Sequence, residues 1–172
     1  GIPFPPLAER FERLEEQLAI VTGLWETPVG DTFSFDGAHF QLTDSPALPK
    51  PVQSPRPPVL IGGWGKTRTP RLAARFADEF NVPFMPLDGF RPACQRVHAA
   101  CQAAGRDPAS LRYTFAAETC VGTGVAEFRR RAAAIGRDPD QMRAGGASGT
   151  VSEVVDGLNA KQPVMVVLAD VA

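Results

Sequence analysis

The chain has 172 residues, of which 44% are hydrophobic and 22% charged, and its formal net charge at pH 7 is −1. This length and composition suit one globular domain with a hydrophobic core of its own. A charge balance so close to zero argues against binding to nucleic acid or to an anionic membrane surface. The longest apolar run, around Val164 to Ala169, is too short to cross a bilayer, and the first residues do not resemble a signal peptide.

The first two segments of the chain are a predicted helix and a predicted hairpin with a loop. Within residues 1–25, apolar side chains recur at helical spacing from Leu7 to Trp25, which predicts an amphipathic helix. Within residues 26–58, polar and apolar residues alternate around Asp36-Gly37, which predicts a β-hairpin. Residues 44–58 are rich in proline and are predicted to be extended loop. Long loops usually cover a site, so we expect the hairpin and loop to form a lid.

The third segment, residues 59–172, alternates apolar strands with helices, the pattern of βαβ units in a parallel sheet. The predicted strands are residues 59–62, 79–84, 112–122 and 164–170. The predicted helices are residues 69–77, 90–104, 125–135 and 151–159. We therefore predict a single α/β domain over residues 1–172, with four parallel strands of which the first and the last are the edges.

Residues 105–108 and 136–139 carry the same tetrapeptide, Gly-Arg-Asp-Pro, each time after a predicted helix. In both copies glycine can end the helix, aspartate can cap the next turn and proline can open it. The three cysteines, Cys94, Cys101 and Cys120, lack the spacing of metal ligands. We interpret them as reduced core residues, which predicts a cytoplasmic protein with no metal site.

The turn after the first predicted strand is the main candidate site. Three glycines there allow a tight turn and close approach of the backbone to a ligand, and Pro70 fits the first position of the next helix. The free N–H groups and positive dipole end of that helix, with Lys66 and Arg68 beside them, would attract a phosphate. An ordinary strand-to-helix turn with solvated charges is the alternative. The candidate binding residues are Gly62, Gly63, Trp64, Gly65, Lys66 and Thr67.

Other candidates are weaker. Residues 145–150 form a second glycine-rich segment, but Glu153 stands three residues after Thr150, the spacing of a capping box, so we favour helix capping over ligand contact. His98 lies within a predicted helix, and we interpret it as a surface or packing residue. His39 lies in the predicted hairpin, where a cofactor-facing role is the less favoured alternative. Glu118 lies in a predicted strand. No set of residues for nucleophilic catalysis stands out, so the catalytic residues are unknown.

Four stretches together resemble the luciferase-like monooxygenases and the related oxidoreductases that depend on coenzyme F420. They are Pro-Pro-Leu-Ala-Glu-Arg-Phe-Glu-Arg-Leu-Glu-Glu-Gln-Leu at residues 5–18, Leu-Thr-Asp-Ser-Pro-Ala-Leu-Pro-Lys-Pro-Val at 42–52, the block at 62–81, and Gly-Arg-Asp-Pro at 105–108. The resemblance, carried by the order and spacing of these stretches, spans residues 1 to about 160. After Ala160 the chain departs from the family pattern.

The resemblance implies a (β/α)₈ barrel, of which this chain is the carboxyl-terminal half. It also implies that the turn at residues 62–67 holds the phosphate of FMN or coenzyme F420, and that the reaction is hydride transfer or monooxygenation of a small molecule. Half a barrel would have two free edges and an open apolar inner face, so we expect a homo-oligomer or a complementing amino-terminal half. The alternatives are a non-catalytic truncated module that self-associates and an unrelated barrel fragment that binds phosphorylated metabolites.

Overall fold

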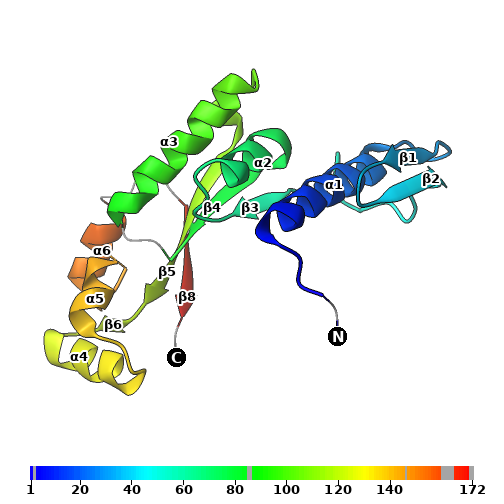
Figure 1. Ribbon diagram of the computed structural model, residues 1–172. Helices are drawn as coiled ribbons and strands as arrows, with labels where there is room; N and C mark the ends of the chain where they lie inside the picture. The colour runs from blue at the N-terminus through cyan, green and yellow to red at the C-terminus, as the bar shows by residue number, and fades with distance from the viewer. Residues whose placement is uncertain (2, 85–86, 146, 160–164, 171–172) are drawn as a thin grey trace. The chain divides into compact units, whose positions relative to one another are not determined.

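The computed structural model describes residues 1, 3–84, 87–145, 147–159 and 165–170, with side chains described for all of these except 87, 88 and 165–170. The chain forms two compact units, Gly1–Val59 and Leu60–Ala172. Figure 1 shows the elements of both. Among the described residues, no helix is both long enough and apolar enough to cross a membrane.

The first unit consists of one helix and one hairpin. Helix α1 (Leu7–Glu26) confirms the predicted amphipathic helix, and it ends where the Thr27 amide and hydroxyl both donate to the Gly23 carbonyl, at 3.0 and 2.7 Å. Strands β1 (Phe33–Asp36) and β2 (Gln41–Ser45) pair antiparallel and confirm the hairpin. The turn differs from the predicted Asp36-Gly37 turn because it spans residues 37–40, closed by the Gly37 amide on the Phe40 carbonyl at 2.9 Å.

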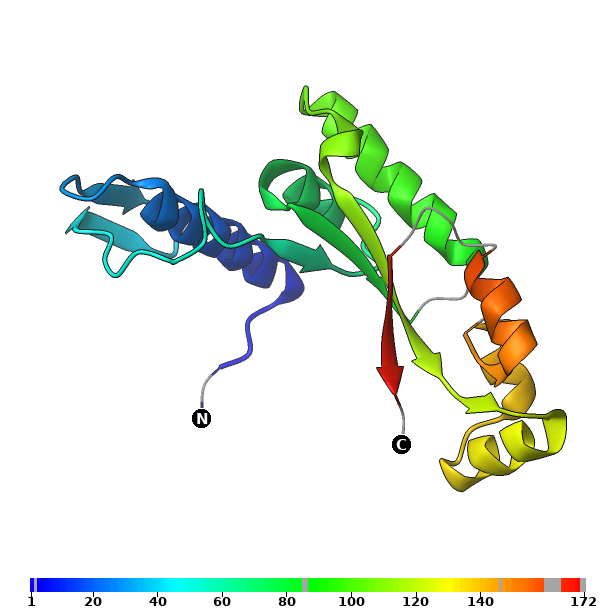
Figure 2. The same cartoon turned by 180° about the vertical axis from the view of Figure 1, so that it is seen from behind.

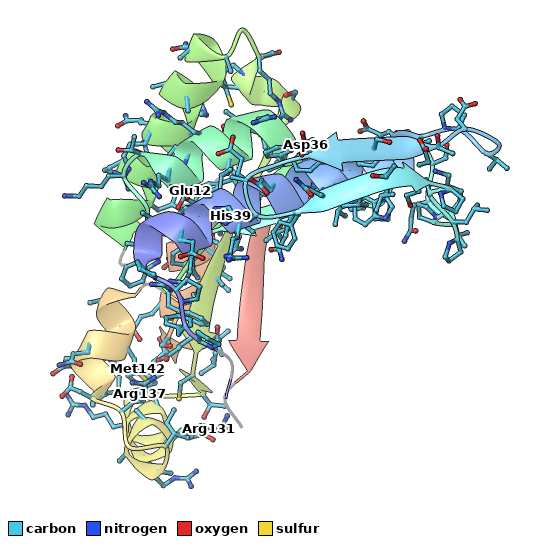
Figure 3. The ribbon with its side chains drawn as sticks, turned by 45° about the vertical axis from the view of Figure 1, so that its right-hand side comes forward. Glu12, Asp36, His39, Arg131, Arg137 and Met142 are labelled. Atoms are coloured by element: carbon cyan, nitrogen blue, oxygen red, sulfur yellow. The ribbon has the colours of Figure 1, made fainter. Side chains whose placement is uncertain are left out.

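This hairpin turn is fixed to α1 by one carboxylate. The amides of Ala38, His39 and Phe40 all donate to Glu16, at 2.8, 3.0 and 3.0 Å. The His39 ring lies beside Glu12, one turn earlier on α1, with 3.2 Å between Nε2 and Oε2 (Figure 3). Desolvation raises the pKa of Glu16, but the three backbone donors together outweigh it, so this pKa lies below its ordinary value of 4.5. The turn of the predicted lid is therefore attached to the helix that precedes it.

We expect Glu16→Gln to release the turn, because an amide cannot accept three hydrogen bonds as a carboxylate does. Amide hydrogen exchange at Ala38, His39 and Phe40 should accelerate about tenfold, while Glu12→Gln, which removes only an exposed pair, should leave it unchanged. A carboxylate with a lowered pKa contributes stability above its unfolded-state pKa and loses it as the pH falls through the folded-state value. The protection of these amides, taken relative to their intrinsic exchange rate at each pH, should therefore also fall below about pH 4.5 in the wild type but not in Glu16→Gln. Equal exchange in all three chains would contradict the attachment.

The second unit is built on a parallel sheet. Strands β3 (Leu60–Gly62), β4 (Glu79–Pro83), β5 (Arg112–Thr119) and β8 (Met165–Asp170) lie in the order β3-β4-β5-β8, all parallel. The predicted strand order and the two predicted edges are thus confirmed. Helices α2 (Arg68–Phe76) and α3 (Leu87–Ala103) lie together on one side of the sheet (Figures 1 and 2). Helix α3 begins three residues before its predicted start.

The predicted strand over residues 112–122 is wrong as a single element. It breaks at Cys120, after which β6 (Val121–Gly122) leaves the main sheet and pairs with β7 (Gly149–Thr150). The Ser148 hydroxyl maintains the break by accepting from the Cys120 amide and donating to the Glu118 carbonyl, at 3.0 and 3.2 Å. Around this small sheet lie α4 (Val125–Ala134), α5 (Pro139–Ala144) and α6 (Val151–Asn159). Helix α5 follows the second Gly-Arg-Asp-Pro and was not predicted.

Both copies of that tetrapeptide act as predicted. Gly105 and Gly136 have φ values of +70° and +71°, which glycine adopts without strain after a helix. Asp107 accepts from the Ala109 amide before the short 3₁₀ helix η1 (Pro108–Ser110), and Asp138 accepts from the amides of Asp140 and Gln141 before α5.

The two faces of the sheet differ in chemistry. On the helix side, Phe80, Val82 and Phe115 are buried, and the Phe115 ring meets Phe90 of α3 edge-on at 5.7 Å. On the opposite side, the Thr114 hydroxyl accepts from the side-chain amide of Asn81 at 2.8 Å and donates to the Glu79 carboxylate at 2.7 Å. The expected open apolar inner face is therefore wrong over β4 and β5, which carry a hydrogen-bonded polar ladder there.

Candidate functional site

The predicted binding residues form one continuous turn at the carboxyl end of edge strand β3. Gly62 is the last residue of the strand, residues 63–66 form the turn, and Thr67 immediately precedes α2. In parallel α/β folds this end of the strands is where ligands bind. Pro70 is the third residue of α2 rather than the first, because the helix already begins at Arg68. Pro70 still lies in the first turn, where a missing N–H costs no hydrogen bond.

Two glycines are required by the shape of the turn. The Gly63 amide still donates to the Asn81 carbonyl of β4, at 3.1 Å, but Gly63 has φ +144°, where other residues are strained. Gly65 lies against Thr69 of α2, so that a β-carbon at this position would collide with the threonine hydroxyl. The backbone therefore leaves the sheet at Gly63 and folds closely over the start of α2.

Trp64 lies between these glycines with 54% of its surface exposed. Its indole Nε1–H donates to the carbonyl of Pro83, the last residue of β4. The side chain therefore connects the turn to the neighbouring strand. Trp64 was predicted to be a binding residue, and no sequence signal indicated this hydrogen bond.

The turn is electropositive. From Gly62 to Ala77 the sequence contains one lysine, three arginines and no carboxylate. The first turn of α2 has no acidic residue, and the Thr67 side chain makes no capping hydrogen bond. Within the described part of the chain, the amides of Gly65, Lys66 and Thr67 receive no hydrogen-bond partner. Unpartnered amides at the amino end of a nine-residue helix can bind an anion.

The second glycine-rich segment, by contrast, already contains its own anion. The Thr150 amide donates to Glu153 at 2.6 Å, and the Glu153 amide lies 3.4 Å from the Thr150 hydroxyl. The backbone and side-chain hydrogen bonds that Thr150 makes to the Glu153 carboxylate hold its pKa below the ordinary value. The capping interpretation is confirmed, and Glu153 occupies the place an anionic ligand would need. Gly146 lies outside the described residues.

Two other candidates of the second unit, His98 and Glu118, contact residues outside the turn. His98 is exposed on α3 with its ring 5.0 Å from Tyr113. Glu118 lies in β5, which confirms its expected strand position, and it pairs with Arg137. Figure 3 labels Arg137 and Met142, and Met142 belongs to α5, which packs on α4. Among the described residues, no group of three or more His, Cys, Asp or Glu side chains is placed to hold a metal ion.

The conformation of Phe84, at the carboxyl end of β4, was not predicted from the sequence. Phe84 follows β4 directly, is exposed, and has φ +48°, while its amide continues the sheet by donating to the Ala116 carbonyl at 2.8 Å. It lies at a pocket of about 230 Å³ whose other lining residues are Phe115, Ala117, Glu118, Gln141, Met142, Ala144 and Gly145. Phenylalanine rarely adopts positive φ, so no sequence pattern could have indicated this conformation.

The family profile of the luciferase-like monooxygenases matches residues 1–162 of this chain. An F420-dependent glucose-6-phosphate dehydrogenase of Microbacterium testaceum is 32% identical over 80 residues, which are 46% of this chain and 22% of the relative. An FMNH(2)-dependent dimethylsulfone monooxygenase of Pseudomonas putida is 30% identical over 105 residues, 61% of this chain and 28% of the relative.

Solved structures of the same kind share the fold. An F420-dependent secondary alcohol dehydrogenase superposes on 98% of this chain with a TM-score of 0.77 at 15% identity, and the match covers 58% of the dehydrogenase. Monooxygenase RslO1 from Streptomyces bottropensis superposes on 97% of this chain with a TM-score of 0.76 at 19% identity, over 57% of its own length. These neighbours are luciferase-like TIM-barrel proteins, and the chain spans little more than half of each. The profile match over residues 1–162 shows that the chain belongs to the luciferase-like monooxygenase family.

Proposed function

We propose that this chain is the carboxyl-terminal half of a luciferase-like barrel and that its turn at residues 62–67 binds the phosphate of FMN or coenzyme F420. The half-barrel is supported by four parallel strands in chain order and by neighbours of which the chain matches 57–58%. In this proposal residues 1–172 are one domain, with 1–25 and 26–58 as its helix and its hairpin-and-loop segment and 59–172 as its βα units.

The observation that carries the phosphate assignment is that the amides of Gly65, Lys66 and Thr67 have no partner among the described residues. A phosphate oxygen at the amino end of α2 would accept from these amides, and the positive end of the helix dipole would favour its charge. Lys66 is exposed and flexible enough to add a charge-assisted contact. The turn therefore fits the phosphate end of either cofactor, and this phosphate is the chemistry that FMN and F420 share.

The chemistry of the reaction would come from the cofactor, since a bound flavin or deazaflavin transfers hydride or activates oxygen itself. The part of the protein described here would bind and orient the phosphate end. The family includes both F420-dependent dehydrogenases and FMNH(2)-dependent monooxygenases, so a small-molecule oxidoreductase reaction is the proposed activity. Family membership does not favour the alternative of a non-catalytic module.

The test is a charge reversal in the turn. Lys66→Glu should weaken FMN binding by about 10- to 100-fold, because it replaces attraction to phosphate by repulsion worth about 1–3 kcal/mol. Arg129→Glu changes the net charge equally on exposed α4 and should leave affinity unchanged. Fluorescence titration with FMN and with riboflavin, which lacks the phosphate, measures both. If Lys66→Glu weakens the binding of FMN and of riboflavin equally, or weakens the binding of neither, the turn does not bind the phosphate.

A further inference from the structure

The Trp64 indole occupies a position in the β3–β4 hydrogen-bond ladder. The two strands are parallel, with Gly62 opposite Asn81, and the last backbone bond between them runs from the Gly63 amide to the Asn81 carbonyl at 3.1 Å. In a parallel ladder successive bonds from one strand occur every second residue. The next donor would be the Gly65 amide, and the next acceptor the Pro83 carbonyl. The Pro83 carbonyl instead accepts from the indole Nε1–H of Trp64.

This exchange changes what the Gly65 amide can do. Because the indole satisfies Pro83, the backbone can leave the strand at Gly63, whose φ of +144° turns it out of the ladder. Gly65 then packs on Thr69 of α2, and its amide has no partner within the described residues. If position 64 had no side-chain donor, either the Pro83 carbonyl would lack a hydrogen-bond partner or the Gly65 amide would donate to it as part of the strand.

We propose that Trp64 is a positioning residue of the anion site: its indole N–H replaces the Gly65 amide in the sheet and leaves that amide free to bind the phosphate. This inference rests on the proposed function of the turn. In this role the indole acts through the phosphate alone. That separates it from a stacking role, in which the loss of the ring would affect ligands with and without a phosphate equally.

Trp64→Phe keeps the ring and removes the N–H donor. The test follows the Gly65 amide by ¹H–¹⁵N NMR while wild type, Trp64→Phe and the control Trp25→Phe are titrated with FMN, riboflavin and inorganic phosphate. FMN and phosphate are expected to shift this amide in the wild type. Trp64→Phe should raise the dissociation constants of both about tenfold, the loss of one well-oriented hydrogen bond, and leave that of riboflavin unchanged. Trp25→Phe should match the wild type.

The outcomes separate the two proposals. If neither FMN nor phosphate shifts the Gly65 amide in the wild type, the turn is not an anion site and both proposals are wrong. If FMN and phosphate shift the Gly65 amide and bind with equal affinity to the wild type and to Trp64→Phe, only the proposed role of Trp64 is wrong. If Trp64→Phe weakens the binding of FMN and of riboflavin equally, the ring contacts the flavin and the proposed role of its N–H is overturned. If Trp64→Phe does not fold, hydrogen exchange of the wild-type indole N–H decides: protection is expected, and exchange at the rate of free tryptophan overturns the inference.

Discussion

Phe80→Ala is expected to destabilise the second unit by about 3–5 kcal/mol, which exceeds the expected effect of any substitution at the turn. Phe80 is only 1% exposed, stands on the central strand β4, and lies on the helix side of the sheet. Its ring also meets Tyr113 edge-on, with 6.5 Å between centroids. Removing it leaves a cavity between the sheet and its helices, and the loss includes both the buried area and the contacts of the cavity wall.

The matched control lies on the other face of the same sheet. Leu60 precedes the buried Ile61 on β3, is opposite Glu79 in the register, and is 56% exposed. In an unassociated chain Leu60→Ala should change the free energy of unfolding by less than about 0.5 kcal/mol. Urea unfolding at low protein concentration, followed by circular dichroism, compares the two variants. Similar losses in both would mean that the core is not confined to the helix side.

Most of the helices and strands were predictable because their signals are local. Helix α1 shows apolar residues at helical spacing, and the two Gly-Arg-Asp-Pro segments carry their own capping chemistry. The predictions that were wrong depend on contacts distant in sequence. The break in the strand at Cys120 depends on Ser148, and the four-residue hairpin turn is supported by Glu16, 22 residues before Ala38.

The inner face of the sheet was mispredicted for a related reason. Alternation along β4 places Glu79 and Asn81 on one side, but only the register with β5 brings Thr114 between them. A single strand shows isolated polar residues, whereas the paired strands show a satisfied network, which is what permits polar groups there.

The position of the candidate site could be predicted from the sequence, but the contacts that shape it could not. Glycine spacing and the following cations indicated the turn, because glycine conformations and helix ends are local properties. The hydrogen bond from Trp64 to Pro83 and the positive φ of Phe84 both arise where β3 and β4 end side by side. Neither follows from a motif, since each requires knowing which carbonyl the neighbouring strand presents.

The final prediction concerns association of the proposed half-barrel. Each of β3 and β8 has a strand partner on one side only within the described sheet, and such edges pair readily with another chain. The ladder of Glu79, Asn81 and Thr114 beside exposed Leu60 gives the inner face a polar and an apolar part. We therefore expect the 172-residue chain to form a closed two-fold dimer at low micromolar concentration, unless a chain supplying the first four strands is added.

Sedimentation equilibrium should give twice the chain mass for the wild type, and Leu60→Lys should shift the midpoint of association at least tenfold towards higher concentration, because it brings a charge onto the covered face. Val155→Lys, at a similarly exposed position on α6, should dimerise like the wild type. Adding a chain that supplies the missing strands should replace the dimer by a one-to-one complex. A cooperatively folded monomer across the same concentrations, with Leu60→Lys indistinguishable from wild type, would show that this sheet needs no second half and would contradict the half-barrel proposal.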